Sequence, residues 1–333
     1  MAGDVITEMA KRICRMHPEA PTKTLARRLV RECRGAITLE QARKRISRQF
    51  GLNGKSDLKD MRPATQRPPR TSGEQRAMPK SLAEPWTPHV MNVLGPVGII
   101  SDVHVPYHSE IAVAAAVGFL KEQNLKGLLL NGDIADFYAI SRYMKDPTQR
   151  DFKGELEAVR RFIEWLRQEF PKIPIIYKLG NHEDRWQHWL WQHAAEISDD
   201  PRMSLCAWLD LDKHNVTLVD DQRPVMLGKL PVLHGHELPK GMAAPVNVAR
   251  GAFLRTLSTV LVGHSHRTSN HAESDMWHHE TACWSTGCLC DLRPEYAKFN
   301  RWNWGFAMAT IHKGGAFDVH NYRVMSDGTV RSA

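Results

Sequence analysis

The chain has 333 residues, more than a typical single domain, so we expect one large domain together with a smaller one. Hydrophobic residues make up 42% of the chain and charged residues 25%, with a formal net charge of +8, which is typical of a globular protein with an ample core. No apolar run is long enough to span a bilayer and no signal-peptide pattern opens the chain, so membrane and secreted classes are not expected.

The six cysteines are scattered along the chain and include no Cys-x-x-Cys pair. This spacing argues against a zinc ribbon and against a disulfide framework. Cys288 and Cys290 could share a metal, but alternating cysteines on a strand are more often packing residues. A reducing cytoplasm is therefore the expected location.

The basic excess lies in the first quarter of the chain. Residues 1–80 contain 19 Lys and Arg against 8 Asp and Glu, whereas the remainder contains 26 against 29. A locally basic field is what binding to a polyanion such as DNA or RNA requires. A solvated helical face followed by a basic linker would give the same imbalance, and the sequence does not separate the two interpretations.

Helical patterns fill the start of the chain. Thr38 precedes Gln41 at the spacing of a capping box, which predicts the beginning of a helix. Short helices joined by His-Pro and Arg-Gly turns predict a small basic helical module over residues 1–52, in the manner of a helix-turn-helix. Residues 53–93 are rich in Pro, Arg and Gly and have few apolar side chains to bury, which predicts an extended linker.

From residue 94 to 333, strand and helix patterns alternate. Helices are expected at residues 110–123 and 152–170. Strands are expected at residues 97–101, 127–131, 173–178, 216–219, 230–233 and 259–262, with a final group over 304–324. We therefore expect an α/β domain of two packed mixed β-sheets flanked by helices.

Polar residues follow five of the expected strands. In chain order they are Asp102-Val103-His104, Gly132-Asp133, Gly180-Asn181-His182-Glu183, His234-Gly235-His236 and Gly263-His264-Ser265-His266. The carboxyl ends of parallel strands meet at one edge of a sheet, and residues two apart on a strand point the same way, so these side chains can converge. Each motif alone has an ordinary explanation as a turn or a packed histidine, and the ordered set does not.

The chemistry of this set favours a pair of divalent ions. Carboxylates, imidazoles and one amide oxygen suit Mn²⁺, Fe²⁺ or Zn²⁺ and do not form a thiolate site. Seven ligands exceed what one ion needs, whereas an Asp can be shared between two. A structural zinc site is closed by four ligands and does not account for the excess.

The ordered set resembles the calcineurin-like metallophosphoesterase superfamily, over roughly residues 96–325. The stretch from Gly180 to Arg185, together with the basic helical module, is similar to members from bacteriophages and prophages. The resemblance implies the calcineurin-like phosphoesterase fold and a dinuclear phosphoester hydrolase. Two ions about 3.5–4 Å apart can clamp a phosphoryl group and supply a metal-activated hydroxide for in-line attack. Mn²⁺ is the expected metal, with Fe²⁺, Zn²⁺ and Ni²⁺ as alternatives.

The same resemblance assigns the ligands. It implies one ion held by Asp102, His104 and His266. A second ion would be held by Asn181, His234 and His264, with Asp133 as the bridge between the two ions. From spacing alone, His236 is not excluded as a further member of the site.

Other residues are expected to handle the substrate. The resemblance implies that His182 stands by the leaving group, as general acid or as a stabiliser of the transition state. Asp136 matches the family's Gly-Asp-x-x-Asp pattern and is the expected partner of His182, although a helix cap would explain Asp136 equally well. Arg185 and Arg267 are expected either to bind phosphate oxygens or to form salt bridges. The Arg-Gly that follows this pattern in the phosphoprotein-phosphatase branch is replaced by Phe137-Tyr138, which argues against that activity.

Three functions are weighed on this basis. A phosphodiesterase or nuclease acting on nucleic acid is favoured by the basic N-terminal region. A phosphomonoesterase or nucleotide phosphatase is the alternative within the same chemistry. A nucleic-acid-binding or assembly protein with a non-catalytic phosphoesterase scaffold is the alternative from another class, and the complete ligand set argues against it. The location is expected to be the cytoplasm, or the host cytoplasm for a phage-encoded chain. The sequence specifies neither the natural substrate nor the oligomeric state.

Overall fold

Three helices form the N-terminal unit: α1 (Ala2–Met16), α2 (Thr22–Glu32) and α3 (Leu39–Ser47). Their apolar faces enclose a small core that includes Leu25, Leu29 and Ile46. The predicted capping box begins α3, because Thr38 Oγ1 accepts from the Gln41 N–H at 3.2 Å and Gln41 Oε1 accepts from the Thr38 N–H at 3.0 Å.

The computed structural model describes residues 2–18, 20–49, 80–144, 146, 148, 151–220, 222–239 and 246–333. The chain divides into two units, residues 1–84 and 85–333. Residues 53–79 of the predicted linker lie outside the described residues. Its last residues belong to the second unit, because β1 (His89–Val90) pairs in parallel with β6 (Val225–Leu227) and Met91 is buried beside it.

Two mixed sheets make up the second unit, as the sequence predicts. The order of the seven-stranded sheet is β13 (Val330–Ser332), β12 (Phe317–Val324), β11 (Gly305–Ile311), β2 (Gly95–Ile100), β3 (Gly127–Asn131), β4 (Ile175–Lys178) and β5 (Val216–Val219). Strands β2 to β5 are parallel and the other three are antiparallel. The order of the six-stranded sheet is β1, β6, β7 (Leu230–Leu233), β8 (Val260–Val262), β10 (Glu280–Ser285) and β9 (Ser269–Ser274).

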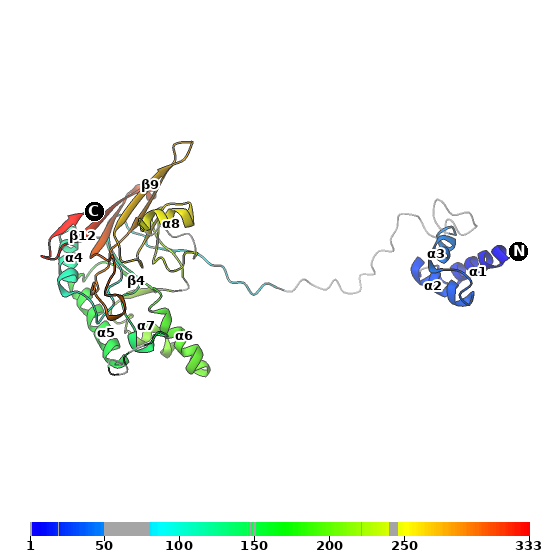
Figure 1. The fold of residues 1–333 in the computed structure, drawn as a ribbon, viewed down its shortest axis with the longest axis horizontal. Coiled ribbons are helices and arrows are strands. Elements are labelled where there is room, and N and C mark those ends of the chain that lie inside the picture. Colours follow the sequence, from blue (N-terminus) through cyan, green and yellow to red (C-terminus); the bar gives the residue numbers. More distant parts are fainter. Residues whose placement is uncertain are drawn as a thin grey trace. The chain divides into compact units, whose positions relative to one another are not determined.

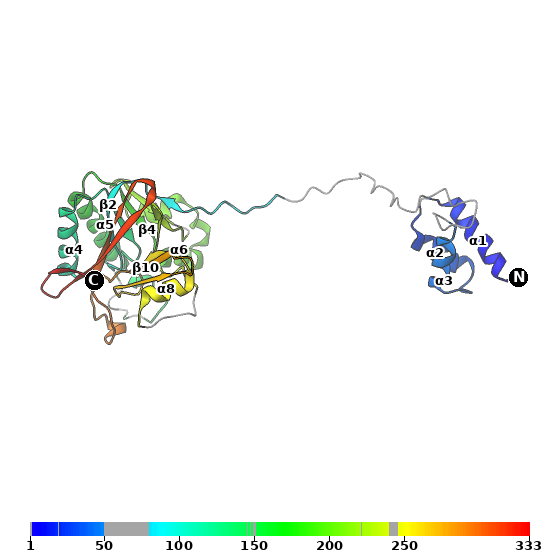
Figure 2. The same ribbon diagram turned by 90° about the horizontal axis from the view of Figure 1, so that it is seen from above.

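The two sheets and their helices form layers, which Figures 1 and 2 show from two directions. Alternate residues of β2 face opposite sides, so Ile99 packs between the sheets with Leu261 while Ile100 faces the helices with Leu120. Helices α4 (Glu110–Glu122) and α5 (Phe152–Glu169) cover the outer face of the seven-stranded sheet. Helix α8 (Val248–Thr256) covers the six-stranded sheet.

Two short helices, α6 (Asp184–His193) and α7 (Leu205–Trp208), lie between β4 and β5 in the chain. None of the described helices is both long enough and apolar enough to cross a membrane. The parallel strands β2, β3 and β4 are neighbours in one sheet, and β7 and β8 are parallel neighbours in the other. These are the five strands whose ends carry the predicted motifs, so the fold brings the motifs to one edge of the layered structure.

Candidate metal centre

Six of the seven predicted ligands meet where the carboxyl ends of the two sheets adjoin, and Asn181 follows β4 at the same edge. Hydrogen bonds between the sheets fix this edge: the His264 N–H donates to Asp102 Oδ2 at 2.9 Å, and His234 Nδ1 lies 2.8 Å from the Asn131 carbonyl oxygen. Each predicted ion would draw ligands from both sheets. The ligands are Asp102, His104, Asp133 and Asn181 from the seven-stranded sheet and His234, His264 and His266 from the six-stranded sheet.

Asp133 lies at the middle of the group. Its Oδ2 is 3.2 Å from His234 Nε2 and 3.9 Å from His104 Nε2, so one oxygen faces imidazoles from both predicted ion positions. Its Oδ1 accepts the backbone N–H of His182 at 2.9 Å, which fixes the carboxylate plane. Gly180 packs against this carboxylate, and any side chain there would collide with Asp133 Oδ1. This is the geometry that a bridging ligand needs.

The ligand atoms are close enough to hold ions. His266 Nε2 lies 3.1 Å from Asp102 Oδ1 and 3.3 Å from His104 Nε2, which brings the three ligands of the first predicted ion together. In the second group, ligand atoms of Asp133, His234 and His264 all lie within 4.8 Å of one another.

Several of these atoms are buried without a hydrogen bond. Asp102 Oδ1, Asn181 Oδ1 and His234 Nε2 have none, although Asp102 Oδ1 lies 3.1 Å from His266 Nε2 and His234 Nε2 lies 3.2 Å from Asp133 Oδ2. Burying an unsatisfied polar atom costs free energy, and native proteins rarely do so without another ligand. All three atoms belong to predicted metal ligands, so the donor set fits two divalent cations.

The backbone at the site is strained. Five of the seven ligands have φ between +51° and +66°: Asp102, His104, Asp133, His264 and His266. Such conformations cost on the order of 1–3 kcal/mol per residue and concentrate at functional sites. Here they turn the side chains that follow β2, β3 and β8 into the common edge.

Charges within the group balance each other. Burial alone would raise the pKa of Asp102, but the imidazoles of His266 and His234 outweigh it and lower that pKa to about 2. In turn, burial opposes protonation of His234 and His266, and the carboxylates beside them raise both pKa values to about 10. Cations bound here would replace these protons.

His182 differs from the predicted ligands, because both of its ring nitrogens already contact the protein. Its Nδ1 is 2.8 Å from the Asp136 carbonyl oxygen and 3.1 Å from Asp136 Oδ1, and its Nε2 is 2.9 Å from Arg185 Nη2. A cationic guanidinium at Nε2 disfavours a metal ion there, although His182 lies within reach of His104 and Asp133. Burial opposes protonation of His182, and the Asp133 and Asp136 carboxylates outweigh it and raise its pKa.

Asp136 and Arg185 support this histidine. Asp136 Oδ1 also lies 2.8 Å from His104 Nδ1, so the carboxylate contacts one predicted ligand and the predicted acid together and does not act as a helix cap. Arg185 Nη1 donates to the Asp136 carbonyl oxygen at 2.9 Å. Arg267 follows His266 and is half-buried, but among the described residues it does not line the cavity beside His182.

His236 lies at the margin of the group. Its Nε2 is 3.3 Å from Asp184 Oδ2, at the first residue of α6, and its Nδ1 is 3.6 Å from Glu237 Oε2. Its ring centroid is 6.3 Å from that of His264. The first histidine of His-Gly-His therefore contacts Asp133, and the second contacts carboxylates around the site.

Glu183 is a supporting residue that the sequence interpretation left without a role. Its buried carboxylate ties the Asp133 loop to the turn that carries Asn181. It accepts hydrogen bonds of 2.7–3.0 Å from the backbone N–H groups of Asp133, Ile134, Ala135 and Gly180 and from the Tyr177 hydroxyl. Its position in the Gly-Asn-His-Glu motif is the sequence feature that could have identified Glu183 as a site residue.

A buried ion pair supports the other side. Lys178 Nζ lies 2.6 Å from Glu237 Oε1. Glu237 also accepts the backbone N–H groups of His234 and Gly235 at 3.2 Å and 2.6 Å, which positions the turn after β7. In the sequence, this pair is indicated only by Lys178, a charged residue at the end of the apolar strand β4.

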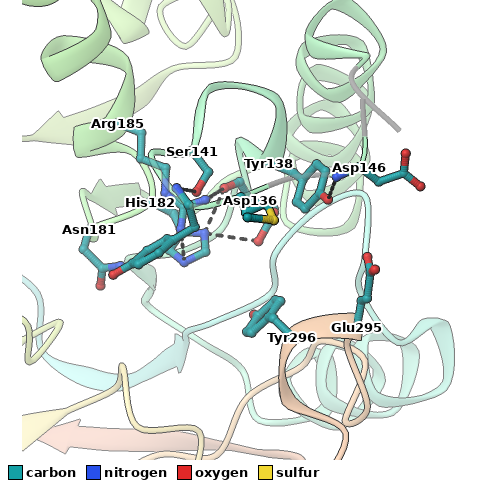
Figure 3. Close-up of a pocket in the computed structure, with 11 residues that line it drawn as sticks. Asp136, Tyr138, Ser141, Asp146, Asn181, His182, Arg185, Glu295 and Tyr296 are labelled. Atoms are coloured by element: carbon teal, nitrogen blue, oxygen red, sulfur yellow. Dashed lines mark hydrogen bonds and ion pairs between the residues drawn. The ribbon is translucent and has the colours of Figure 1, made fainter. Parts of the chain in front are cut away.

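A cavity of about 840 Å³ lies beside His182 (Figure 3). Asn181, His182 and Arg185 line it from the turn at the start of α6. Figure 3 shows two other segments that contribute to it, one with Tyr138 and Asp146 and one with Glu295 and Tyr296. Tyr143 and Met144 belong to the first of these segments. Of the wall residues on these two segments, the sequence interpretation named only Tyr138, as a departure from the phosphoprotein-phosphatase pattern.

Known proteins resemble this chain to different degrees. The family model described as calcineurin-like phosphoesterase matches residues 95–289, a range that includes all seven predicted ligands. The Gene 54 proteins of Mycobacterium phages L5 and D29 are each 26% identical, over 226 and 227 residues, which is 64% of this chain and 88% of each relative.

Similar solved structures include Vacuolar Protein Sorting 29 from Cryptosporidium parvum, with 14% identity and a TM-score of 0.39 over 72% of this chain and 97% of that one. A dimetal phosphatase from Danio rerio has 12% identity and a TM-score of 0.34, over 68% of this chain and 95% of that one.

Proposed function

Because the chain belongs to the calcineurin-like phosphoesterase family, we propose that it is a two-metal phosphoester hydrolase, specifically a phosphodiesterase or nuclease acting on nucleic acid with Mn²⁺. The observation that carries the proposal is the set of buried, unsatisfied ligand atoms gathered around Asp133. These atoms favour a bound cation, because each costs free energy in the metal-free fold.

The residues present fit two divalent ions. Asp102, His104 and His266 would hold one ion and Asn181, His234 and His264 the other, with Asp133 shared between them. When bound, such ions polarise a phosphoryl oxygen and lower the pKa of a shared water. Glu183 and Glu237 keep the ligand-bearing turns in register, as their hydrogen bonds to backbone N–H groups show.

His182 is the proposed general acid. Asp136 holds its Nδ1, and Nε2 accepts from Arg185 Nη2, which can only donate. To give a proton to the leaving oxygen, Nε2 must first take one up, which the Asp133 and Asp136 carboxylates favour, while Arg185 turns to a phosphate oxygen. The Arg185 guanidinium beside Nε2 lowers the pKa of this imidazole and opposes the two aspartates that raise it. Arg185 also lines the cavity, where its remaining donors can meet a phosphate oxygen.

The preference for nucleic acid is supported by the N-terminal unit. A groove of about 410 Å³ between α1 and α3 is lined by Lys11, Lys44, Arg45 and Arg48 and by no acidic residue among those described. Such a surface suits a phosphate backbone. A phosphomonoesterase or nucleotide phosphatase would use the same metal centre but would give this groove no role. The mycobacteriophage relatives are consistent with action in a host cytoplasm, which we propose as the location.

A hydrolysis panel tests the proposal. With added Mn²⁺, the protein is offered a phosphomonoester, a small phosphodiester, and single- and double-stranded DNA. We expect the diester and at least one form of DNA to be cleaved. Asp133→Asn should reduce this activity by more than about 100-fold, which is the upper end of the loss caused by removing a residue that only supports a ligand. Full activity in Asp133→Asn would overturn the two-metal proposal, and hydrolysis of the monoester alone would favour the phosphatase.

A further inference from the structure

The cavity beside His182 has aromatic walls on two separate segments. Tyr138 belongs to the short 3-10 helix Tyr138–Ile140 and Tyr296 to the 3-10 helix Glu295–Ala297, with Tyr143 beyond the first of these. Tyr143 and Tyr296 are 64% and 67% exposed. The guanidinium carbon of Arg142 lies over the Tyr143 ring, 5.4 Å from its centroid, so Tyr143 offers one face to a ligand. The cavity volume lies within the range of pockets that enclose small organic ligands, about 300–1,000 Å³.

These rings are anchored to the fold. Tyr138 Oη accepts the Asp146 N–H at 2.9 Å, and its ring lies 6.1 Å from that of Tyr107. The Tyr296 ring lies 6.3 Å from the ring of Trp302, which in turn lies 4.1 Å from the ring of His266. The aromatic wall thus runs directly into the predicted metal centre.

Charge is distributed unevenly around the cavity. Arg185 provides the basic side, next to His182 and the metal centre. Asp146 and Glu295 lie on the two aromatic segments instead (Figure 3). Both carboxylates would repel a second phosphate. Asp146 Oδ1 already accepts the Thr148 N–H and hydroxyl at 2.9 Å and 2.7 Å, so the Glu295 carboxylate is the acceptor for an amino group of the ligand. The cavity therefore suits a group that carries one phosphoester at the centre and an uncharged planar ring with amino donors in the cavity.

From this arrangement we propose that the cavity binds the nucleoside of the leaving group, with its base stacked on Tyr296 and Tyr143. The inference rests on the proposed function, because it takes His182 to mark the leaving-group side. Every base can stack on an aromatic face, so this subsite selects nucleosides over plain sugars, and the Glu295 carboxylate favours bases that carry an amino group. The substrate class is then an ester of a nucleoside, presented as an unstacked or single-stranded end.

Binding of adenosine and of ribose to the full chain, measured by calorimetry, tests the proposal without requiring hydrolysis. We expect adenosine to bind and ribose to bind at least about fivefold more weakly, since stacking on one aromatic ring is worth at least that factor. Tyr296→Leu and Tyr143→Leu should each weaken adenosine binding by a similar factor. Tyr296→Phe should retain binding, because the ring and not the hydroxyl makes the stack.

The matched control is Phe299→Leu, which removes a fully exposed ring from the same loop but not from the cavity. A second measurement compares Mn²⁺-dependent kcat/KM for a dinucleotide with that for dinucleotides made abasic at one position or the other. The subsite would be supported if kcat/KM falls when the base on the leaving side is removed. In Tyr296→Leu, the substrates with and without that base should then have the same kcat/KM. Hydrolysis with equal binding of adenosine and ribose would overturn the subsite alone. Selective adenosine binding that needs both tyrosines, without any hydrolysis, would support a nucleoside site and overturn the proposed catalysis.

Discussion

At the scale of single residues, neighbouring side chains of one motif have separate contacts. Asn181 presents a buried oxygen without a hydrogen bond, whereas His182 has both ring nitrogens engaged by Asp136 and Arg185. Glu183 accepts five hydrogen bonds, one of them from the backbone N–H of Asp133, and does not line the cavity. These contacts agree with the roles proposed for three consecutive residues, which are a ligand, an acid and a structural support.

His182→Ala tests the division between ligand and acid. We expect the rate of hydrolysis to fall by about 10²–10⁴-fold, the usual contribution of a general acid. Manganese content, measured by atomic emission, should stay at about two ions per chain, as a dinuclear centre requires. A variant that loses an ion along with its activity would place His182 among the ligands.

Glu183→Gln tests the support. The carboxylate of Glu183 accepts its hydrogen bonds with two oxygens, whereas the amide of Gln has only one. The NH₂ group of the amide would face backbone N–H donors. We expect the free energy of unfolding in urea to drop by about 2–4 kcal/mol, since leaving buried donors unsatisfied costs about 1–3 kcal/mol each. Glu196→Gln, at an exposed glutamate after α6, is the matched control and should change stability by less than about 0.5 kcal/mol. Equal stabilities of the two variants would contradict the supporting role.

At the scale of elements, Glu155 couples α5 to the cavity wall. Its buried carboxylate accepts the Ala139 N–H at 3.0 Å, next to Tyr138. Burial, reinforced by the charge of Asp136, raises the pKa of Glu155 to about 7. A carboxyl group whose pKa is higher in the folded state than in the unfolded state favours folding while it is protonated.

The pH dependence of stability follows from that sign. As pH rises from about 4.5 to about 7, the unfolded chain loses this proton first, so Glu155 lowers the free energy of unfolding over that window. The loss should be on the order of 2–3 kcal/mol, at about 1.4 kcal/mol per pKa unit. Urea unfolding of the wild type and of Glu155→Gln at pH 5 and pH 8 measures it, because the variant lacks the titrating group. Parallel pH profiles would show that Glu155 titrates normally.

Elements with a strong apolar period could be predicted from the sequence, and the others could not. The runs at β3 and β5 matched the structure to the residue because each is a short apolar segment bounded by polar residues. The hairpin of β9 and β10 was missed because β9 is polar and mostly exposed, with backbone pairing and no buried face to mark it. Helix α8 was missed as well, since its buried face consists mainly of small residues such as Ala249 and Ala252.

The site was likewise predictable in part, because the ligands could be predicted from the sequence and the cavity wall could not. Its ligands follow strand ends, so strand order alone brings them together. The wall residues Tyr143 and Tyr296 come from loops more than a hundred residues apart, and no spacing rule connects them. The motif marks Glu183 as a residue of the site. Its hydrogen-bond partners are backbone N–H groups, which cannot be predicted from residue types.

At the scale of the whole molecule, the chain combines two units with different surfaces. The N-terminal unit has its own small core and a basic groove, and the metal centre belongs entirely to residues 85–333. The two functions proposed for them should therefore be separable.

Deleting residues 1–80 tests that separation. We expect hydrolysis of a small phosphodiester to persist while binding to DNA, followed by gel shift over a salt series, becomes weaker and less salt-dependent. The slope of log affinity against log salt should become shallower by about 0.9 for each lost phosphate contact. Replacing Lys44, Arg45 and Arg48 with Gln in the full chain should reproduce part of that change. Equal DNA binding by the full-length and the shortened protein would dismiss the N-terminal unit as a nucleic-acid-binding surface.

The two sheets are separate hydrogen-bonded ladders, and each predicted ion would take ligands from both. Bound metal would therefore cross-link the two sheets at this edge. Without metal, the hydrogen bond from the His264 N–H to Asp102 Oδ2 and the apolar core between the sheets still hold this edge together. Bound metal should therefore slow amide exchange at the ends of β2 and β8, and the degree of slowing would report metal occupancy.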